Sequence, residues 1–239
     1  MTQRHPTPTL AQSYPGPLGS PQMPVPLYRT LLIGVVPKAR QYPPPPFETE
    51  DLQRAFLEIT KAYSYSQFGL LPAEGGAQLS NGSDDVLLIQ PGSFHLTTPI
   101  TTTERTCEKA VDLFKVLANR FETQVFVQSG INVLAHVPVP DGGDPVAFLS
   151  QRLLGGGERA SRLGPRFNEA GVKFRAASAE SGDLQEEYLL VEPLIESEKD
   201  LWVSYNVVRV KEFGLDQISE WLRDAFSFVG GQAMEILEV

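Results

Sequence analysis

Cysteine is nearly absent from this sequence, since Cys107 is the only one among 239 residues. A single thiol forms no intramolecular disulfide and builds no CxxC metal or redox motif. A free cysteine within a helical apolar stripe usually behaves as a small buried hydrophobe. We therefore expect Cys107 to lie on the buried face of a helix, without a chemical role.

Histidine is also scarce, and His5, His95 and His136 do not stand at a metal-ligand spacing. We interpret His95 and His136 as solvated or hydrogen-bonded strand residues. The three consecutive glycines at 155–157 follow a predicted helix and precede no GK[ST], so they are not a phosphate-binding loop. No GxSxG elbow occurs. The sequence predicts no catalytic residues, no metal and no cofactor.

Basic charge and long apolar runs are lacking as well. Twenty Lys and Arg residues stand against 29 Asp and Glu, and the formal charge of −9 argues against non-specific binding to nucleic acid. The sequence contains no run of about 18 apolar residues, so it predicts no membrane-spanning helix. In a secretory signal an apolar segment follows the basic N-terminal residues, and here no such segment follows Arg4 and His5. We expect a cytoplasmic protein that does not enter membranes.

Hydrophobic residues, at 41% of the chain, are sufficient for a substantial core. They begin after residue 26, because the segment 1–26 is rich in Pro, Gly, Ser, Thr and Gln. Prolines at this density prevent a continuous helix or strand ladder. We predict a disordered Pro-rich tail over 1–26, and a role as a polyproline ligand is the alternative interpretation.

The first ordered half, residues 27–129, predicts the element order β-α-β-β-α-β. Apolar runs indicate a strand at 31–36, a hairpin of strands 86–90 and 93–98, and a strand at 123–128. Helical stripes indicate a helix from Thr49 to Tyr63 and another after the capping-box pair Thr101 and Glu104. Gly75, Gly76 and residues 81–83 indicate a loop. This order is that of a ferredoxin-like unit.

The second half, residues 130–239, predicts nearly the same order. It has strand patterns at 131–137, 172–175, 188–191 and 201–210, helices from Asp144 and from Leu215, and a last strand over 234–239. Leu32–Pro37 resembles Val133–Pro138, 101 positions later. One of the three middle strands is in excess and is interpreted as an edge strand, while 201–210 is expected at the centre. We predict an α+β fold of two tandem ferredoxin-like units, 27–129 and 130–239, with mainly antiparallel sheets.

The strongest helical signal is near the C-terminus. Ile218, Trp221, Leu222, Ala225, Phe226 and Val229 recur at the spacing of one helical face. Gly230 and Gly231 then favour the end of the helix. Because this face is so apolar, we expect the helix to pack on the sheet.

Two charged blocks of opposite sign follow each other in the second half. Residues 152–175 carry a net charge of +4, and residues 176–200 carry −7. The basic block comprises Arg152, Arg159, Arg162, Arg166, Lys173 and Arg175. These blocks either solvate a hairpin and pair with each other, or the arginine loop binds an anion or an acidic partner surface through bidentate contacts.

Two further residues are candidates for a ligand site, since Trp202 and Tyr205 place aromatic rings on a strand. The duplicated plan resembles the dimeric α+β barrel group, some of whose members bind haem through a histidine of the second repeat. No histidine follows His136, so the resemblance supplies no haem ligand here. The sequence Arg166-Phe167-Asn168, the acidic hairpin and the Phe-ended helix also resemble a sporadically distributed family of uncharacterised bacterial proteins, which implies no activity.

Two functions therefore remain open. One is a non-catalytic binding or assembly protein that holds a protein partner through a sheet face and the arginine-rich loop. It includes the possibility of a homodimer or larger assembly. The other is an enzyme or small-ligand carrier with an aromatic-lined pocket between two sheets, to which Trp202 and Tyr205 would contribute.

Overall fold

A computed structural model describes residues 25–82, 84–139, 142–152, 171–180 and 183–237. Its strands are β1 (Leu27–Pro37), β2 (Gln67–Leu71), β3 (Gly76–Ser80), β4 (Val86–Gln90), β5 (Ser93–Pro99), β6 (Phe126–Pro138), β7 (Val172–Glu180), β8 (Asp183–Pro193) and β9 (Asp200–Phe213). Its helices are α1 (Thr49–Ile59), α2 (Thr103–Arg120), α3 (Pro145–Arg152), α5 (Leu215–Gly230) and α6 (Gln232–Leu237).

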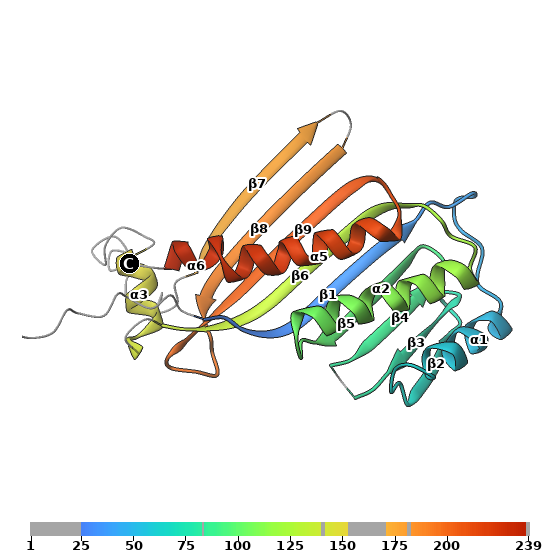
Figure 1. The fold of residues 1–239 in the computed structure, drawn as a ribbon, viewed down its shortest axis with the longest axis horizontal. Helices are drawn as coiled ribbons and strands as arrows, with labels where there is room; N and C mark the ends of the chain where they lie inside the picture. The colour runs from blue at the N-terminus through green and yellow to red at the C-terminus, as the bar shows by residue number, and fades with distance from the viewer. Residues whose placement is uncertain (1–24, 83, 140–141, 153–170, 181–182, 238–239) are drawn as a thin grey trace, which may run out of the picture.

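All of these strands form one antiparallel sheet of nine strands, in the order β2-β3-β4-β5-β1-β6-β9-β8-β7. The helices α1, α2, α5 and α6 lie on the same side of it (Figure 1). The core therefore lies in a single layer between these helices and one sheet face. Sequence-distant β1, β6 and β9 are neighbours at the centre of the sheet.

Alternation along the central strands determines which face is buried. On β1, Leu31, Ile33 and Val35 are at most 2% exposed, while Leu32 and Val36 are only half-buried. The strands β6 and β9 repeat this pattern through their odd-numbered residues. Because successive strand side chains point to opposite faces, the odd-numbered set contacts the helices and the even-numbered set forms the opposite face.

The C-terminal helix α5 is confirmed, and every residue of its predicted apolar face is buried. The expected strand over 234–239 is wrong for residues 234–237, which belong to the short helix α6, and residues 238 and 239 lie outside the described residues. Met234 and Leu237 are three residues apart, a spacing that also suits one helical face, and both are buried. The prediction that this segment is apolar and buried is correct, but its apolar residues follow the period of a helix and not that of a strand.

The prediction of two tandem ferredoxin-like units is wrong, since the described strands share one continuous sheet. The decisive element is β6, which runs without a break through the expected boundary between residues 129 and 130. The two strands predicted at 123–128 and 131–137 correspond to this one strand. In the structure Gly130 pairs with Gly34 on one side and with Val208 on the other, so it belongs to the sheet interior.

The short internal similarity also does not describe equivalent positions. It aligned Leu32 with Val133 and Ile33 with Leu134, but Leu32 lies on the exposed face of the sheet and Val133 on the buried face. An odd offset between two strands exchanges their faces, because the side-chain period is two. The resemblance therefore reflects two apolar strands of similar composition.

Local predictions did better than the overall plan. The hairpin of β4 and β5 is confirmed, with Gln90 paired to Ser93. The strand β9 is central, as expected, and β7 is an edge strand. The hairpin of β2 and β3 was missed because the glycines near residues 75 and 76 were interpreted as a loop. Gly75 does make that turn, with φ of 63°, while Gly76 is already the first residue of β3.

No helix within the described part of the chain is long and apolar enough to span a membrane.

Candidate functional site

The sheet face opposite the helices, which we call the open face, is the first candidate site. Each central strand presents its partly exposed alternate residues there, and neighbouring strands bring those residues into rows. One row joins His95, Gly34, Gly130 and Val208, which are paired in succession across β5, β1, β6 and β9. The next row joins Leu32, Asn132 and Asn206. The open face is thus made of small, apolar and amide side chains at its centre.

The paired glycines create a hollow in the open face, which we call the glycine notch. Its volume is about 320 Å³, and none of its thirteen lining residues is Asp, Glu, Lys or Arg. A Cβ atom added at Gly130 would meet no atom of the described residues within 4 Å, so there is open space directly above this glycine. Glycine inside a strand often marks a place where a ligand or another chain approaches the backbone closely. The notch has that character.

His95 forms the other side of the notch. Its ring covers Gly34 so closely that a Cβ atom there would lie 2.5 Å from the His95 Nδ1 atom. Partial desolvation in this position lowers the pKa of His95 below its ordinary value. The imidazole is therefore neutral at pH 7, and the notch carries no formal charge at that pH.

A second aromatic feature stands on the same face, further along β6 and β9. His136 and Trp202 are cross-strand partners with ring centroids 5.4 Å apart. Arg29 donates from Nε to Nδ1 of His136 at 3.2 Å. Desolvation, and then the charge of Arg29, lower the pKa of His136. Trp202 is only partly buried, so its ring remains available on the open face.

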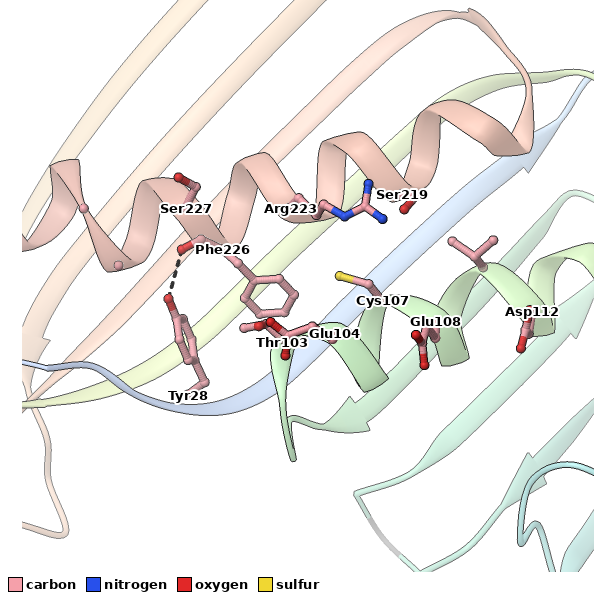
Figure 2. Close-up of a pocket in the computed structure, with 13 residues that line it drawn as sticks. Tyr28, Thr103, Glu104, Cys107, Glu108, Asp112, Ser219, Arg223, Phe226 and Ser227 are labelled. Atoms are coloured by element: carbon pink, nitrogen blue, oxygen red, sulfur yellow. Dashed lines mark hydrogen bonds between the residues drawn. The ribbon is translucent and has the colours of Figure 1, made fainter.

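The helix side of the molecule has a separate groove between α2 and α5 of about 790 Å³ (Figure 2). Its α2 wall carries Glu104, Glu108 and Asp112, and its α5 wall carries Arg223. One end is closed by Tyr28, whose hydroxyl donates to the Phe226 carbonyl at 2.9 Å. This groove has the size of a small-molecule pocket.

The chemistry of the α2–α5 groove is limited by its thiol. Cys107 is 5% exposed, as predicted for the buried face of a helix. Burial raises the pKa of the thiol, and this outweighs the opposing effect of Arg223. The neutral thiol dominates at pH 7 and is a poor nucleophile. The groove has the volume of a small-ligand site, and this arrangement does not activate its cysteine.

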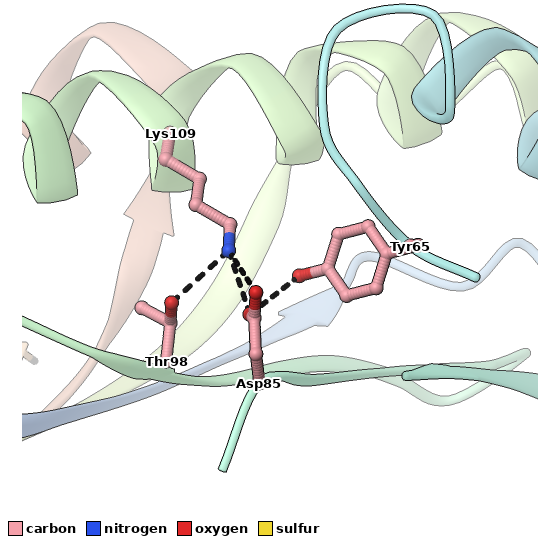
Figure 3. Close-up of polar contacts among 4 residues, drawn as sticks. All are labelled: Tyr65, Asp85, Thr98 and Lys109. Carbon is pink, nitrogen blue, oxygen red and sulfur yellow. Dashed lines mark hydrogen bonds and ion pairs between the residues drawn. The ribbon is translucent and has the colours of Figure 1, made fainter. Parts of the chain in front are cut away.

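A buried polar cluster between α2 and the sheet is structural (Figure 3). Lys109 Nζ lies 2.6 and 2.7 Å from the two carboxylate oxygens of Asp85 and donates to Thr98 Oγ1 at 3.1 Å. Tyr65 donates to Asp85 Oδ1 at 3.0 Å. Burial, and then the Asp85 charge, raise the pKa of Tyr65, so its phenol stays protonated. The ammonium and the carboxylate are satisfied within the cluster, which ties α2 to β5 and to the loop before β4.

The basic residues predicted to bind an anion or a partner are only partly described. Arg159, Arg162 and Arg166 lie outside the described residues, and Arg152 ends α3. Lys173 and Arg175 are exposed on β7, with their charged groups 4.7 and 5.7 Å from the centre of the Tyr188 ring. Arg175 also forms an ion pair with Glu186 at 3.0 Å. This contact is of the kind expected if the opposite blocks pair across a hairpin.

The two predicted ligand-lining aromatics do not meet. Tyr205 is 5% exposed on the helix side, stacked on Phe228 with centroids 4.1 Å apart, and its hydroxyl donates to Glu187 Oε2 at 2.7 Å. Trp202 lies on the open face, because it has the opposite parity on β9. One sheet also leaves no pocket between two sheets. The expected shared pocket is therefore absent for these two residues.

Sequence reasoning missed the glycine notch entirely. Gly34 and Gly130 are isolated glycines in apolar runs, a signal for close backbone approach, but nothing local shows that they face each other. Among the described residues, no cluster of His, Cys, Asp and Glu could hold a metal ion. The chain matches no protein-family model, and it matches no curated protein either.

Proposed function

We propose that this chain is a non-catalytic binding or assembly protein, which holds a protein partner against the open face of its sheet. The observation that carries the proposal is the glycine notch at the centre of that face. In a chain with 21% charged residues, its thirteen lining residues include no Asp, Glu, Lys or Arg. The cores of protein interfaces are depleted in charge in the same way.

The rim of the open face adds a second feature of an interface. Lys173, Arg175 and Tyr188 are cross-strand neighbours at the β7 edge, and Tyr188 lies in the same row as Asn206. An uncharged centre with a polar, solvent-accessible rim is the usual anatomy of a protein-binding surface. Arg175 is paired with Glu186, so of these two basic side chains it is Lys173 that favours an acidic group of the partner at this position, as proposed for the arginine-rich loop.

Site-specific photocrosslinking tests this function. A benzoylphenylalanine residue replaces Asn206 on the open face in one variant and Glu220, exposed on α5, in the matched control. We expect the same protein adduct from position 206 in repeated experiments, and none from position 220. The additional substitution Gly130→Lys should remove the adduct, because a charge at the notch floor would be desolvated on binding. Equal adducts from both positions, or none from 206, would refute the proposal.

A small-ligand role has its own candidate, the α2–α5 groove. Its volume of about 790 Å³ and its mixed apolar and charged walls favour a small molecule that carries a positive group near Glu108. Native mass spectrometry of the purified chain tests this function. A bound small molecule that is lost on Glu108→Gln would support it. A spectrum in which all of the folded chain has the mass of the unliganded protein would count against it.

The negative net charge and the single cysteine of the sequence support a cytoplasmic location, which is part of the same proposal.

A further inference from the structure

We infer that the connector between β1 and α1, residues 39–46, is a docking segment for a protein domain that binds polyproline in a groove of aromatic side chains. The connector contains four consecutive prolines, Pro43 to Pro46, and lies at the end of the sheet where β1 stops (Figure 1). It shares no residue with the glycine notch, so this inference does not rest on the function proposed for the open face.

The conformation of the proline run is determined by proline itself. Each pyrrolidine ring fixes φ at about −65°, and a proline at the next position confines ψ to extended values. Pro43, Pro44 and Pro45 are each followed by a proline, so they adopt the polyproline II helix, which has about three residues per turn. The run directly follows the cis Tyr42–Pro43 peptide bond and has no internal hydrogen bond.

Burial along the run has the same period of three. Pro44 and Phe47 are partly buried, whereas the other three prolines are exposed. Among these, Pro46 rests against Gly75, where an added Cβ atom would lie 2.7 Å from the Pro46 Cβ atom. The run therefore lies on the protein along one side and presents its remaining two prolines to solvent.

Both ends of the connector are fixed to the folded chain. Before it, the Lys38 N–H donates to the Val125 carbonyl at 2.9 Å. After it, the Phe47 N–H donates to the Gly75 carbonyl at 3.0 Å, and the Phe47 ring stacks on Phe121 with centroids 3.9 Å apart. A ligand that is already held in its bound conformation loses little conformational entropy on binding, which favours association.

The connector also carries polar groups that nothing in the described part of the chain satisfies. Residues 39–46 form no hydrogen bond or ion pair with any described residue. Their carbonyl oxygens are therefore free to accept hydrogen bonds from the Tyr and Trp side chains of an aromatic groove. Tyr42 is 93% exposed, so its ring projects into solvent.

Charge and shape add to this ligand character. Arg40 is the only charged residue of the connector, and its unpaired guanidinium favours a partner with an acidic side chain beside the groove. A hollow of about 600 Å³ lies between the connector and residues 121–125, so a partner can also approach the run from that side. A segment that served only to join β1 to α1 would need neither the exposed ring nor the unpaired cation.

The test is a titration of the full chain into purified SH3 and WW domains, which bind polyproline segments in aromatic-lined grooves. Chemical shifts of the isotope-labelled domain report which of its residues make contact. We expect saturable binding to at least one of these domains at micromolar concentrations, with shifts centred on the aromatic groove. An excess of decaproline peptide should displace the chain, because both ligands would occupy the same groove.

Matched variants locate the contact on the chain. Pro43→Ala combined with Pro45→Ala should weaken binding at least about ten-fold, because the exposed part of the polyproline ridge is lost. Pro72→Ala, at an exposed proline in the turn between β2 and β3, should leave the affinity unchanged. Arg40→Glu should also weaken binding about ten-fold, whereas Arg105→Glu, at an exposed and unpaired arginine of α2, should not.

Urea unfolding of each variant, with a midpoint close to that of the natural chain, shows that a loss of binding is not a loss of fold. Absence of binding to every domain at millimolar concentrations would overturn the inference, as would binding that survives the double proline substitution. Crosslinking from position 206 on the open face does not depend on this connector, so the two proposals succeed or fail separately.

Discussion

Removing one partner of the Lys109–Asp85 ion pair should destabilise the fold more than removing both. The two side chains are only 17% and 16% exposed, so the charges lie largely out of water. Lys109→Met keeps the alkyl stem but leaves the carboxylate with Tyr65 as its hydrogen-bond donor. Breaking a fully buried pair in this way costs about 3 to 5 kcal/mol. With partial exposure we expect about 3 kcal/mol, a large fraction of the 5 to 15 kcal/mol typical of a domain.

The double variant Lys109→Met with Asp85→Asn removes both charges and keeps a group that Tyr65 can contact. It should cost no more than about 1 kcal/mol, since replacing both members of a buried pair is often nearly neutral. Asp85→Asn alone should resemble Lys109→Met, because it leaves an unpaired ammonium group. The non-additivity measures the coupling between the two residues.

Urea unfolding of the four proteins gives the free energies of unfolding, with the slope m as a check that the unfolded states are comparable. The reasoning predicts two unstable single variants and a double variant close to the natural sequence. A loss below about 0.5 kcal/mol for Lys109→Met would place the pair in the class of exposed salt bridges. Costs that simply add in the double variant would show that the charges do not interact.

Three further predictions concern single positions. Gly76→Ala should destabilise the fold by about 2 kcal/mol or more in urea unfolding, because its Cβ atom would lie 2.1 Å from the Ile89 carbonyl oxygen. Gly69→Ala, which has free space at the Cβ position, should stabilise the fold by about 0.5 to 1 kcal/mol. Equal effects of the two substitutions would contradict the steric argument. Burial lowers the pKa of His95, so the unfolded chain binds the His95 proton more tightly than the folded chain does. His95 therefore does not reduce the free energy of unfolding above about pH 6.5, and it reduces that free energy progressively as the pH falls below this value. The natural chain should therefore lose more stability than His95→Gln between pH 7.5 and 5, and parallel pH profiles would refute this. Iodoacetamide should modify Cys107 much more slowly in the folded chain than in denaturant, since the thiol is buried with a raised pKa; equal rates would show that it is accessible.

Periodicity in the sequence was sufficient for elements whose register depends on local spacing. The face of α5 was predicted residue by residue, and the buried position of Cys107 followed from the same rule on α2. The capping pattern was less exact, because Thr102 caps α2 where Thr101 was expected. Neighbouring threonines offer the same hydroxyl chemistry, so only the backbone geometry selects between them.

Several of the failures have one cause, which is that strand pairing is not local. A glycine within a strand and a glycine in a turn look alike in sequence, and the sequence analysis placed a boundary between residues 129 and 130, inside what is one strand, β6. The same ambiguity hid the β2–β3 hairpin. Element order alone is compatible with several sheets, and only the pairing of β1 with β6 joins the two halves into one.

The amino-acid sequence by itself determined which segments are apolar and, for most of them, whether their period is that of a helix or of a strand, because these are properties of neighbouring residues. The tertiary structure decided that Gly34 faces Gly130 across β1 and β6, and that the helices α1, α2, α5 and α6 lie over one face of the sheet. These relations join residues about 100 positions apart, and they exist only once the strands have paired and the helices have packed on one side of the sheet.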